Sequence, residues 1–191
     1  MRLLIMGPPG AGKGTQAAVI GAHYNIPPIS TGNIFRVAIT NRTRLGERIK
    51  RIISEGGYVP DSLSVKVVVD RLEEVDAKGG WLLDGFPRTV GQVKALDAEL
   101  DEHGYPLDAV VSLTADEEAL VARMLARAEI EARPDDNEET FRNRLEMYHE
   151  QTDPLLDIYR ERGLLLEIDG MGDVDEVSAR VLAALAERVG S

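Results

Sequence analysis

A glycine-rich segment near the start of the chain restricts the possible folds most. Residues 7–16 read GPPGAGKGTQ and follow the apolar run at 2–6, and the residues after Lys13 suit a helix. Glycines in a turn between a strand and a helix let backbone N–H groups surround a phosphate chain, because no side chains block the approach. Lys13 adds a positive charge at the same place. The segment therefore predicts a P-loop for nucleotide phosphates.

One position departs from the strict pattern G-x-x-x-x-G-K-[ST]. Gly14 stands where a hydroxyl residue is expected, and Thr15 follows one place later. A glycine-rich turn that binds nothing is the alternative interpretation. The strand pattern before the segment and the helical pattern after it favour phosphate binding.

The rest of the chain alternates short apolar runs with helical patterns. Runs typical of buried strands occupy 26–29, 81–83, 109–113 and 164–168, and the run at 81–83 ends at Asp84. Helical patterns open at residues suited to N-caps, namely Asp61, Thr89, Asp116, Asn137 and Asp173. This alternation predicts an α/β fold in which helices flank a five-stranded parallel sheet.

Composition excludes several classes of protein. The 191 residues include no cysteine, and the three histidines lie far apart, so we expect no structural zinc. A net charge of −11 argues against a nucleic-acid-binding surface. No apolar run approaches the roughly 20 residues of a membrane span, and the first strand leads directly into the loop without room for a signal peptide. We expect a cytoplasmic protein with no membrane partner.

Asp84 and six arginines are the candidates for charge chemistry around a phosphate chain. Asp84 ends an apolar run, where a carboxylate at the edge of a sheet could hold Mg²⁺ directly or through water. An ordinary turn residue is the alternative. Arginine recognises phosphate through two parallel hydrogen bonds, whereas an exposed helix face would explain the same residues without a ligand. The candidates are Arg36, Arg88, Arg123, Arg127, Arg133 and Arg144.

Five segments in one order give the chain a family resemblance. They are GPPGAGKGTQ at 7–16, STGNIFR at 30–36, GYVPD at 57–61, LLDGFPRTVGQ at 82–92 and RPDDNEETFRNRL at 133–145. Together they resemble adenylate kinase of the short-lid bacterial type, a nucleoside monophosphate kinase, over essentially the whole chain. The resemblance explains Gly14, because that family has the loop form G-x-P-G-x-G-K-G-T.

The resemblance implies one kinase domain over 1–191. Its core would comprise 1–29, 60–126 and 138–191, with a helical flap for the nucleoside monophosphate (NMP) at 30–59 and a short lid at 127–137. The implied reaction is reversible, Mg²⁺-dependent transfer of the terminal phosphoryl group of ATP to AMP by a monomer. A UMP/CMP kinase is the nearest alternative, and the ending TVGQ of 89–92 favours AMP. A P-loop ATPase switch is the alternative from another class.

Site residues follow from the matching motifs. The catalytic set implied by the resemblance is Lys13, Asp84, Arg88, Arg123, Arg133 and Arg144. Residues implied to bind ATP are Gly10, Ala11, Gly12, Lys13, Gly14, Thr15, Arg123, Arg127 and Gly172. Residues implied to bind AMP are Thr31, Arg36, Gly57, Tyr58, Val59, Gly85, Phe86, Pro87, Arg88, Gln92, Arg133 and Arg144. Asp84 would hold Mg²⁺, through water.

Three positions depart from the family pattern. Asn33 replaces an Asp, Ser62 replaces a Glu, and Ala132 stands where a Gly commonly precedes the lid arginine. Asn33 keeps hydrogen-bonding capacity but lacks a charge that would order the water around Mg²⁺. We therefore expect Asn33→Asp to lower the Mg²⁺ concentration needed for half-maximal rate, and an unchanged Mg²⁺ curve would exclude this role.

Overall fold

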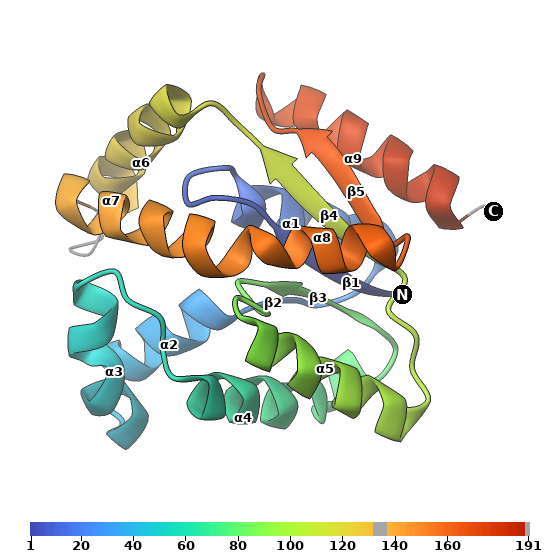
Figure 1. The fold of residues 1–191 in the computed structure, drawn as a ribbon, viewed down its shortest axis with the longest axis horizontal. Helices are drawn as coiled ribbons and strands as arrows, with labels where there is room; N and C mark the ends of the chain where they lie inside the picture. Colours follow the sequence, from blue (N-terminus) through green and yellow to red (C-terminus); the bar gives the residue numbers. More distant parts are fainter. Residues whose placement is uncertain (132–136, 190–191) are drawn as a thin grey trace.

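A computed structural model describes residues 1–131 and 137–189, and the predicted fold class is confirmed (Figure 1). Five parallel strands form one sheet in the order β2-β3-β1-β4-β5. The strands are β1 (Arg2–Met6), β2 (Pro28–Ser30), β3 (Trp81–Asp84), β4 (Ala109–Thr114) and β5 (Leu165–Asp169). The α-helices are α1 (Lys13–Tyr24), α2 (Thr31–Thr40), α3 (Arg44–Ser54), α4 (Asp61–Leu72), α5 (Val90–His103), α6 (Glu117–Glu131), α7 (Glu138–Met147), α8 (Pro154–Glu161) and α9 (Val174–Val189). A 3₁₀ turn, η1 (Val75–Ala77), and a π-helical segment, η2 (Tyr148–Thr152), complete the assignment.

Helices cover both faces of the sheet, which is why its strands are apolar without alternation. Successive side chains of β1 point to opposite faces. Leu3 packs in a cluster with Val181 of α9, whereas Leu4 packs in a second cluster with Val93 of α5. The central strand is therefore buried on both sides and fixes the position of the segment that follows it.

The strand order places that segment between two neighbours. β1 pairs with β3 on one side and β4 on the other, with Ile5 opposite Asp84 and Met6 opposite Ser112. Strands β2 and β3 lie on one side of β1, and β4 and β5 lie on the other, so the connections leave β1 in opposite directions. A crevice at the carboxyl ends of the strands, where the order reverses, is the usual ligand site of an open parallel sheet.

Helices α2 and α3 share an apolar cluster, against which Leu63 and Val67 of α4 pack. Phe35, Ile49 and Val59 are buried together, apart from the two clusters on the sheet. A side chain at Gly46 of α3 would overlap the carbonyl of Ala38 of α2, so glycine allows the two helices to pack closely. In Figure 1 this pair lies at the same end of the molecule as α6 and α7.

Most of the predicted N-caps are confirmed. Thr89 accepts a hydrogen bond from the backbone N–H of Gln92, and Asn137 accepts one from Thr140. Asp173 and Glu176 bond reciprocally to each other's N–H at the start of α9. Asp61 is a correction, because it begins α4 without capping it, and its carboxylate is engaged by α5 instead.

Two boundaries also differ from the predictions. The second strand begins at Pro28 rather than 26, and the pattern that opens at Asn137 continues past 150 through η2 into α8. Pro154 permits this, since the first turn of a helix needs no N–H from that position. Within the described ranges, no helix combines the length and the apolar composition that a membrane span requires.

Helix α9 is fastened to the helix that follows the glycine loop. The Gln16 side chain of α1 donates to the carbonyl of Val174 at 3.3 Å and accepts from the Ser178 hydroxyl at 2.9 Å. Gln16 and Ser178 are both buried. These bonds join residues from the two ends of the described chain beneath the glycine loop.

Candidate active site

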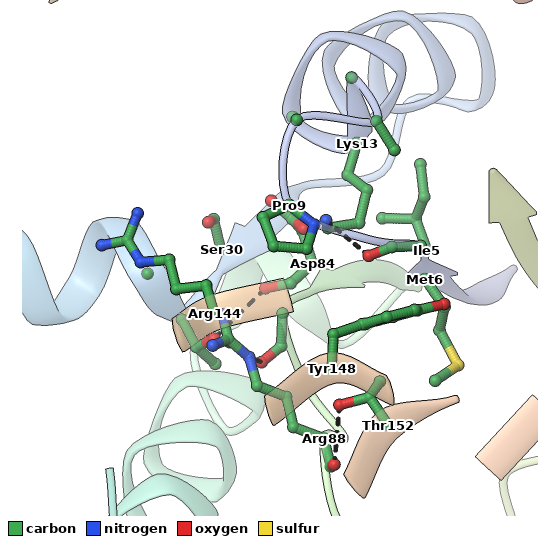
Figure 2. A pocket seen from close by; sticks show the side chains of 18 of the residues that line it. Ile5, Met6, Pro9, Lys13, Ser30, Asp84, Arg88, Arg144, Tyr148 and Thr152 are labelled. Atoms are coloured by element: carbon green, nitrogen blue, oxygen red, sulfur yellow. Dashed lines mark hydrogen bonds between the residues drawn. The ribbon is translucent and has the colours of Figure 1, made fainter. Parts of the chain in front are cut away.

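A cavity of about 940 Å³ opens at the carboxyl edge of the sheet (Figure 2). The glycine loop forms one wall, and α2 with the segment before α4 forms another. Side chains from α6, α7 and η2 complete the lining. Its volume lies near the upper end of the range for small-molecule sites, which gives room for more than one phosphate-bearing ligand.

The glycine loop needs glycine for two reasons. Gly7 and Gly10 have φ angles of 137° and 85°, which side chains rarely adopt. A Cβ at Gly7 would also lie 2.6 Å from the carbonyl oxygen of Leu113. Lys13 begins α1, and its ammonium donates to the carbonyls of Gly7 and Pro8 at 2.8 and 2.9 Å. The loop thus curves around its own lysine at the N-terminus of a helix, a geometry suited to an anion.

Asp84 lies beside the start of the helix that follows the loop. It ends β3 and is half-buried, and a Cβ built at Gly14 would be 3.9 Å from its Oδ2. The position that departs from the strict loop pattern is therefore the one next to the carboxylate. Among the described residues, no group of three or more acidic or histidine side chains is placed so that it could hold a metal ion. This donor set fits Mg²⁺ carried mainly by phosphate and water, with one protein carboxylate.

Arg88 is held in the cavity by several contacts. Its Nε donates to the carbonyl of Gly85 at 2.8 Å, and Thr31 donates to the same oxygen at 2.9 Å. Its backbone carbonyl accepts from Thr152 at 3.0 Å, and that hydroxyl is hydrogen-bonded to Tyr58 at 2.8 Å. The Tyr58 ring lies 5.0 Å from the Arg88 guanidinium. Gly85 and Tyr58 therefore contact the guanidinium itself, and Thr152 holds the backbone that carries it.

Arginines from other elements face the same cavity. Arg36 comes from α2 and donates to the Asn33 side chain at 2.6 Å, Arg144 comes from α7, and Arg123 comes from α6. Tyr148 of η2 lies among them, and burial, with a smaller effect of Asp153, raises the pKa of its hydroxyl. The cavity thus combines several cations with a neutral phenol.

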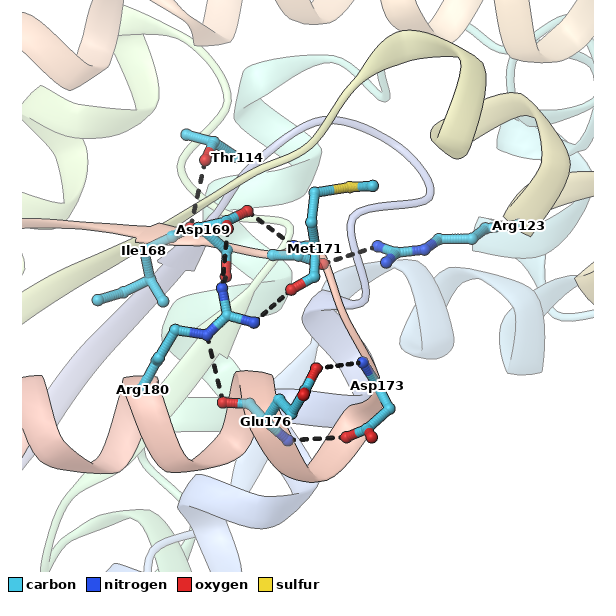
Figure 3. Close-up of polar contacts among 9 residues, drawn as sticks. Thr114, Arg123, Ile168, Asp169, Met171, Asp173, Glu176 and Arg180 are labelled. Atoms are coloured by element: carbon cyan, nitrogen blue, oxygen red, sulfur yellow. Dashed lines mark hydrogen bonds and ion pairs between the residues drawn. The ribbon is translucent and has the colours of Figure 1, made fainter.

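The segment between β5 and α9 also lines the cavity, and Figure 3 shows the polar contacts that hold this segment. Arg123 donates to the carbonyl of Gly170 at 3.0 Å, which joins α6 to this segment. Arg180 of α9 donates to the carbonyl of Asp169 at 2.7 Å and to that of Met171, and its guanidinium pairs with the Asp169 carboxylate at 2.9 Å. Gly172 has a φ of 111° and lines the cavity. We call residues 169–173 the Arg180-braced loop.

The structure brings the predicted residues to one place. Every residue of the predicted catalytic, ATP and AMP sets that the structure describes with its side chain lines this cavity. Arg127 belongs to α6, but its side chain is outside the described part, and Arg133 and Ala132 lie outside the described residues. Ser62 is exposed in the first turn of α4.

Some residues of the site were not predicted. Tyr148 and Thr152 line the cavity from η2, and no motif marks them. Arg180 and Asp61 act on residues distant in sequence. In the sequence, only the capping pattern that opens at Asp173 indicates that the Arg180-braced loop is held in place.

Comparison with known proteins gives a consistent result. A family model described as adenylate kinase matches residues 5–164. The adenylate kinase of Leifsonia xyli subsp. xyli is 58% identical over 97% of this chain and 94% of its own length. Those of Clavibacter michiganensis and Thermobifida fusca are 55% and 47% identical, each over 98% of this chain and over 94% and 100% of their own lengths.

Proposed function

Because the chain belongs to the adenylate kinase family, we propose that it transfers the terminal phosphoryl group of Mg·ATP reversibly to AMP, giving two molecules of ADP. The observation that carries the proposal is that one cavity is lined both by the glycine loop with its lysine and by a group of arginines. Lys13 and the glycine loop lie on one side, and Arg36 and Arg88 lie on the other. A second set of arginines suits an acceptor that is itself a phosphate.

The chemistry asks for alignment and charge neutralisation. The attacking oxygen of AMP belongs to a phosphate that is ionised at neutral pH, so no side chain has to remove a proton. The negative charge on the transferred group and the leaving oxygen is met by Lys13, Arg88 and Arg144, which carry fixed positive charges. Mg²⁺ enters with ATP as part of the substrate and supplies further neutralisation, and Asp84 would hold it through water.

Water must be excluded, because it would otherwise accept the phosphoryl group. We propose that the flap at 30–59 and the lid at 127–137 close over the two nucleotides and bring Arg127 and Arg133 to the phosphates. The apolar cluster of Phe35, Ile49 and Val59 packs α2 and α3 against each other, which supports the first of these as one packed unit that adjoins α4. A cytoplasmic monomer is also part of the proposal.

Phosphorus NMR with Mg·ATP and one acceptor at a time tests the proposal. ADP should accumulate to equilibrium with AMP, and little should form with CMP, UMP or GMP. Preference for CMP or UMP would instead assign the protein as a pyrimidine nucleotide kinase. Release of inorganic phosphate without an acceptor would assign an ATPase switch.

A matched pair of variants tests the arginine assignment. Arg88→Met should lower turnover by about 10³-fold or more, as for other arginines that stabilise a transferring phosphoryl group. Arg142→Met is the control, since Arg142 is exposed on α7 and pairs with Glu138. Equal turnover in the two variants would contradict the assignment.

A further inference from the structure

The side-chain amide of Gln92 is held from two sides. Its Nε2 donates to Asp61 Oδ1 at 2.7 Å, and its Oε1 accepts from the backbone N–H of Arg88 at 2.8 Å. Gln92 is buried and lines the cavity. Because Arg88 offers only a donor and the Asp61 carboxylate only acceptors, both contacts are hydrogen bonds in one orientation of the amide. A flipped amide would face N–H against N–H and oxygen against carboxylate.

Asp61 is itself fixed in place. Its Oδ2 accepts from the Thr89 hydroxyl at 2.8 Å, and Thr89 caps the helix that carries Gln92. The carboxylate also reaches this position only because residue 91 is glycine, since a Cβ there would lie 2.7 Å from Oδ2. The start of α4 is thereby joined to the first turn of α5 through one carboxylate, which bonds α5 rather than capping its own helix.

The fixed amide keeps half of its hydrogen-bonding capacity. A glutamine amide has two N–H groups and two lone pairs, and the contacts to Asp61 and Arg88 use one of each. Among the described residues, no other bond engages the Gln92 amide. One donor and one acceptor therefore remain, in an order that the two contacts determine.

That order distinguishes bases of identical shape. Adenine presents its 6-amino group, a donor, next to N1, an acceptor, and so complements an amide whose oxygen meets the amino group. Hypoxanthine presents O6, an acceptor, next to N1–H, a donor, and needs the amide reversed. Polar groups that meet the wrong partner in a buried site discriminate more strongly than a change of size does.

We propose that Asp61 is a specificity-determining positioning residue, which selects 6-amino against 6-oxo purine monophosphates by fixing the Gln92 amide. The inference rests on the proposed function, in which Gln92 reads the base of the acceptor. It also predicts an order among smaller acceptors. Cytosine shares the donor–acceptor order of adenine, and uracil has the reverse order. Both CMP and UMP should be poor acceptors, but CMP should be the better of the two.

The test compares AMP with IMP, the monophosphate of hypoxanthine, as acceptors. In Asp61→Asn the new amide can turn to donate to a flipped Gln92, so half of the restraint is removed. We expect the ratio of kcat/KM for AMP to that for IMP to fall about tenfold, the size of one hydrogen bond to a charged group. The KM for ATP should stay unchanged. The control is Asp70→Asn, which removes an exposed carboxylate of the same helix that pairs with Lys66.

A second variant displaces the Asp61 carboxylate without replacing Asp61. Gly91→Ala forces the Asp61 side chain to shift, and alanine favours the helix, so this protein should fold at least as well as wild type. The same fall in the AMP-to-IMP ratio is expected. If wild-type protein is active on AMP but both variants keep its AMP-to-IMP ratio of kcat/KM, the inference is overturned and the proposed function stands. Wild-type protein that transfers nothing to AMP would overturn the proposed function and the inference with it.

Discussion

Replacing Arg180 should weaken the binding of ATP and leave that of AMP unchanged. Arg180 never reaches the phosphate side of the cavity, but it holds the carbonyls of Asp169 and Met171 in the braced loop beside Gly172. Its side chain is 36% exposed, so each of the two bonds is assigned only about 1 kcal/mol. Arg180→Met then removes about 2 kcal/mol of loop order.

Part of this lost stabilisation lowers the stability of the whole protein, and the rest loosens the Arg180-braced loop. We therefore expect KM for ATP to rise about tenfold, which corresponds to about 1.4 kcal/mol. The measurement is a pair of initial-rate series, one varying ATP at saturating AMP and one varying AMP at saturating ATP. Arg188→Met provides the control on the same helix, because within 1–131 and 137–189 the one polar contact of Arg188 is a 3.5 Å bond to the carbonyl of Asp108. An equal rise in both KM values, or none relative to the control, would refute the role of the loop.

Three further predictions concern stability and the loop. Tyr159→Phe should raise the free energy of unfolding in urea by up to about 1 kcal/mol, because its buried hydroxyl has no partner among the described residues; Tyr58→Phe, which loses the bond to Thr152, should lower it by a similar amount. The hydrogen bond from Arg71 lowers the pKa of Asp76, so the stabilisation that this bond gives is present above pH 3.8 and disappears as the pH falls through the lowered pKa. The unfolding curves of wild type and Asp76→Asn should therefore converge at acid pH. A difference that stays constant with pH would contradict this. Gly7→Ala should lower the melting temperature by about 2–8 °C, from about 1–2 kcal/mol of strain at a φ of 137°, and a temperature equal to wild type would show that the loop has relaxed.

Local patterns in the sequence predicted much of the fold. Short apolar runs between helical patterns identified all five strands, because a strand buried on both faces must be apolar throughout. Capping residues such as Thr89 and Asn137 act on N–H groups two or three positions away, so the sequence contains the whole interaction.

Long-range interactions account for what was missed. Asp61 has the sequence signature of an N-cap, but Thr89 and Gln92, 28 and 31 positions away, engage its carboxylate. Thr152 lines the cavity from η2 and donates to the carbonyl of Arg88, 64 positions away. No local pattern specifies such contacts, since each depends on how two helices pack.

The bonds between Gln16 and α9 also bear on how the protein is made. Gln16 follows the glycine loop directly, yet its partner Ser178 is 162 positions further along. At translation rates of about 5–20 residues per second, the loop leaves the ribosome about 10–30 seconds before the helix that supports it. An unfinished chain therefore carries the phosphate-binding motif without its support. The two bonds that Gln16 makes to Val174 and Ser178 can therefore form only after α9 has been synthesised.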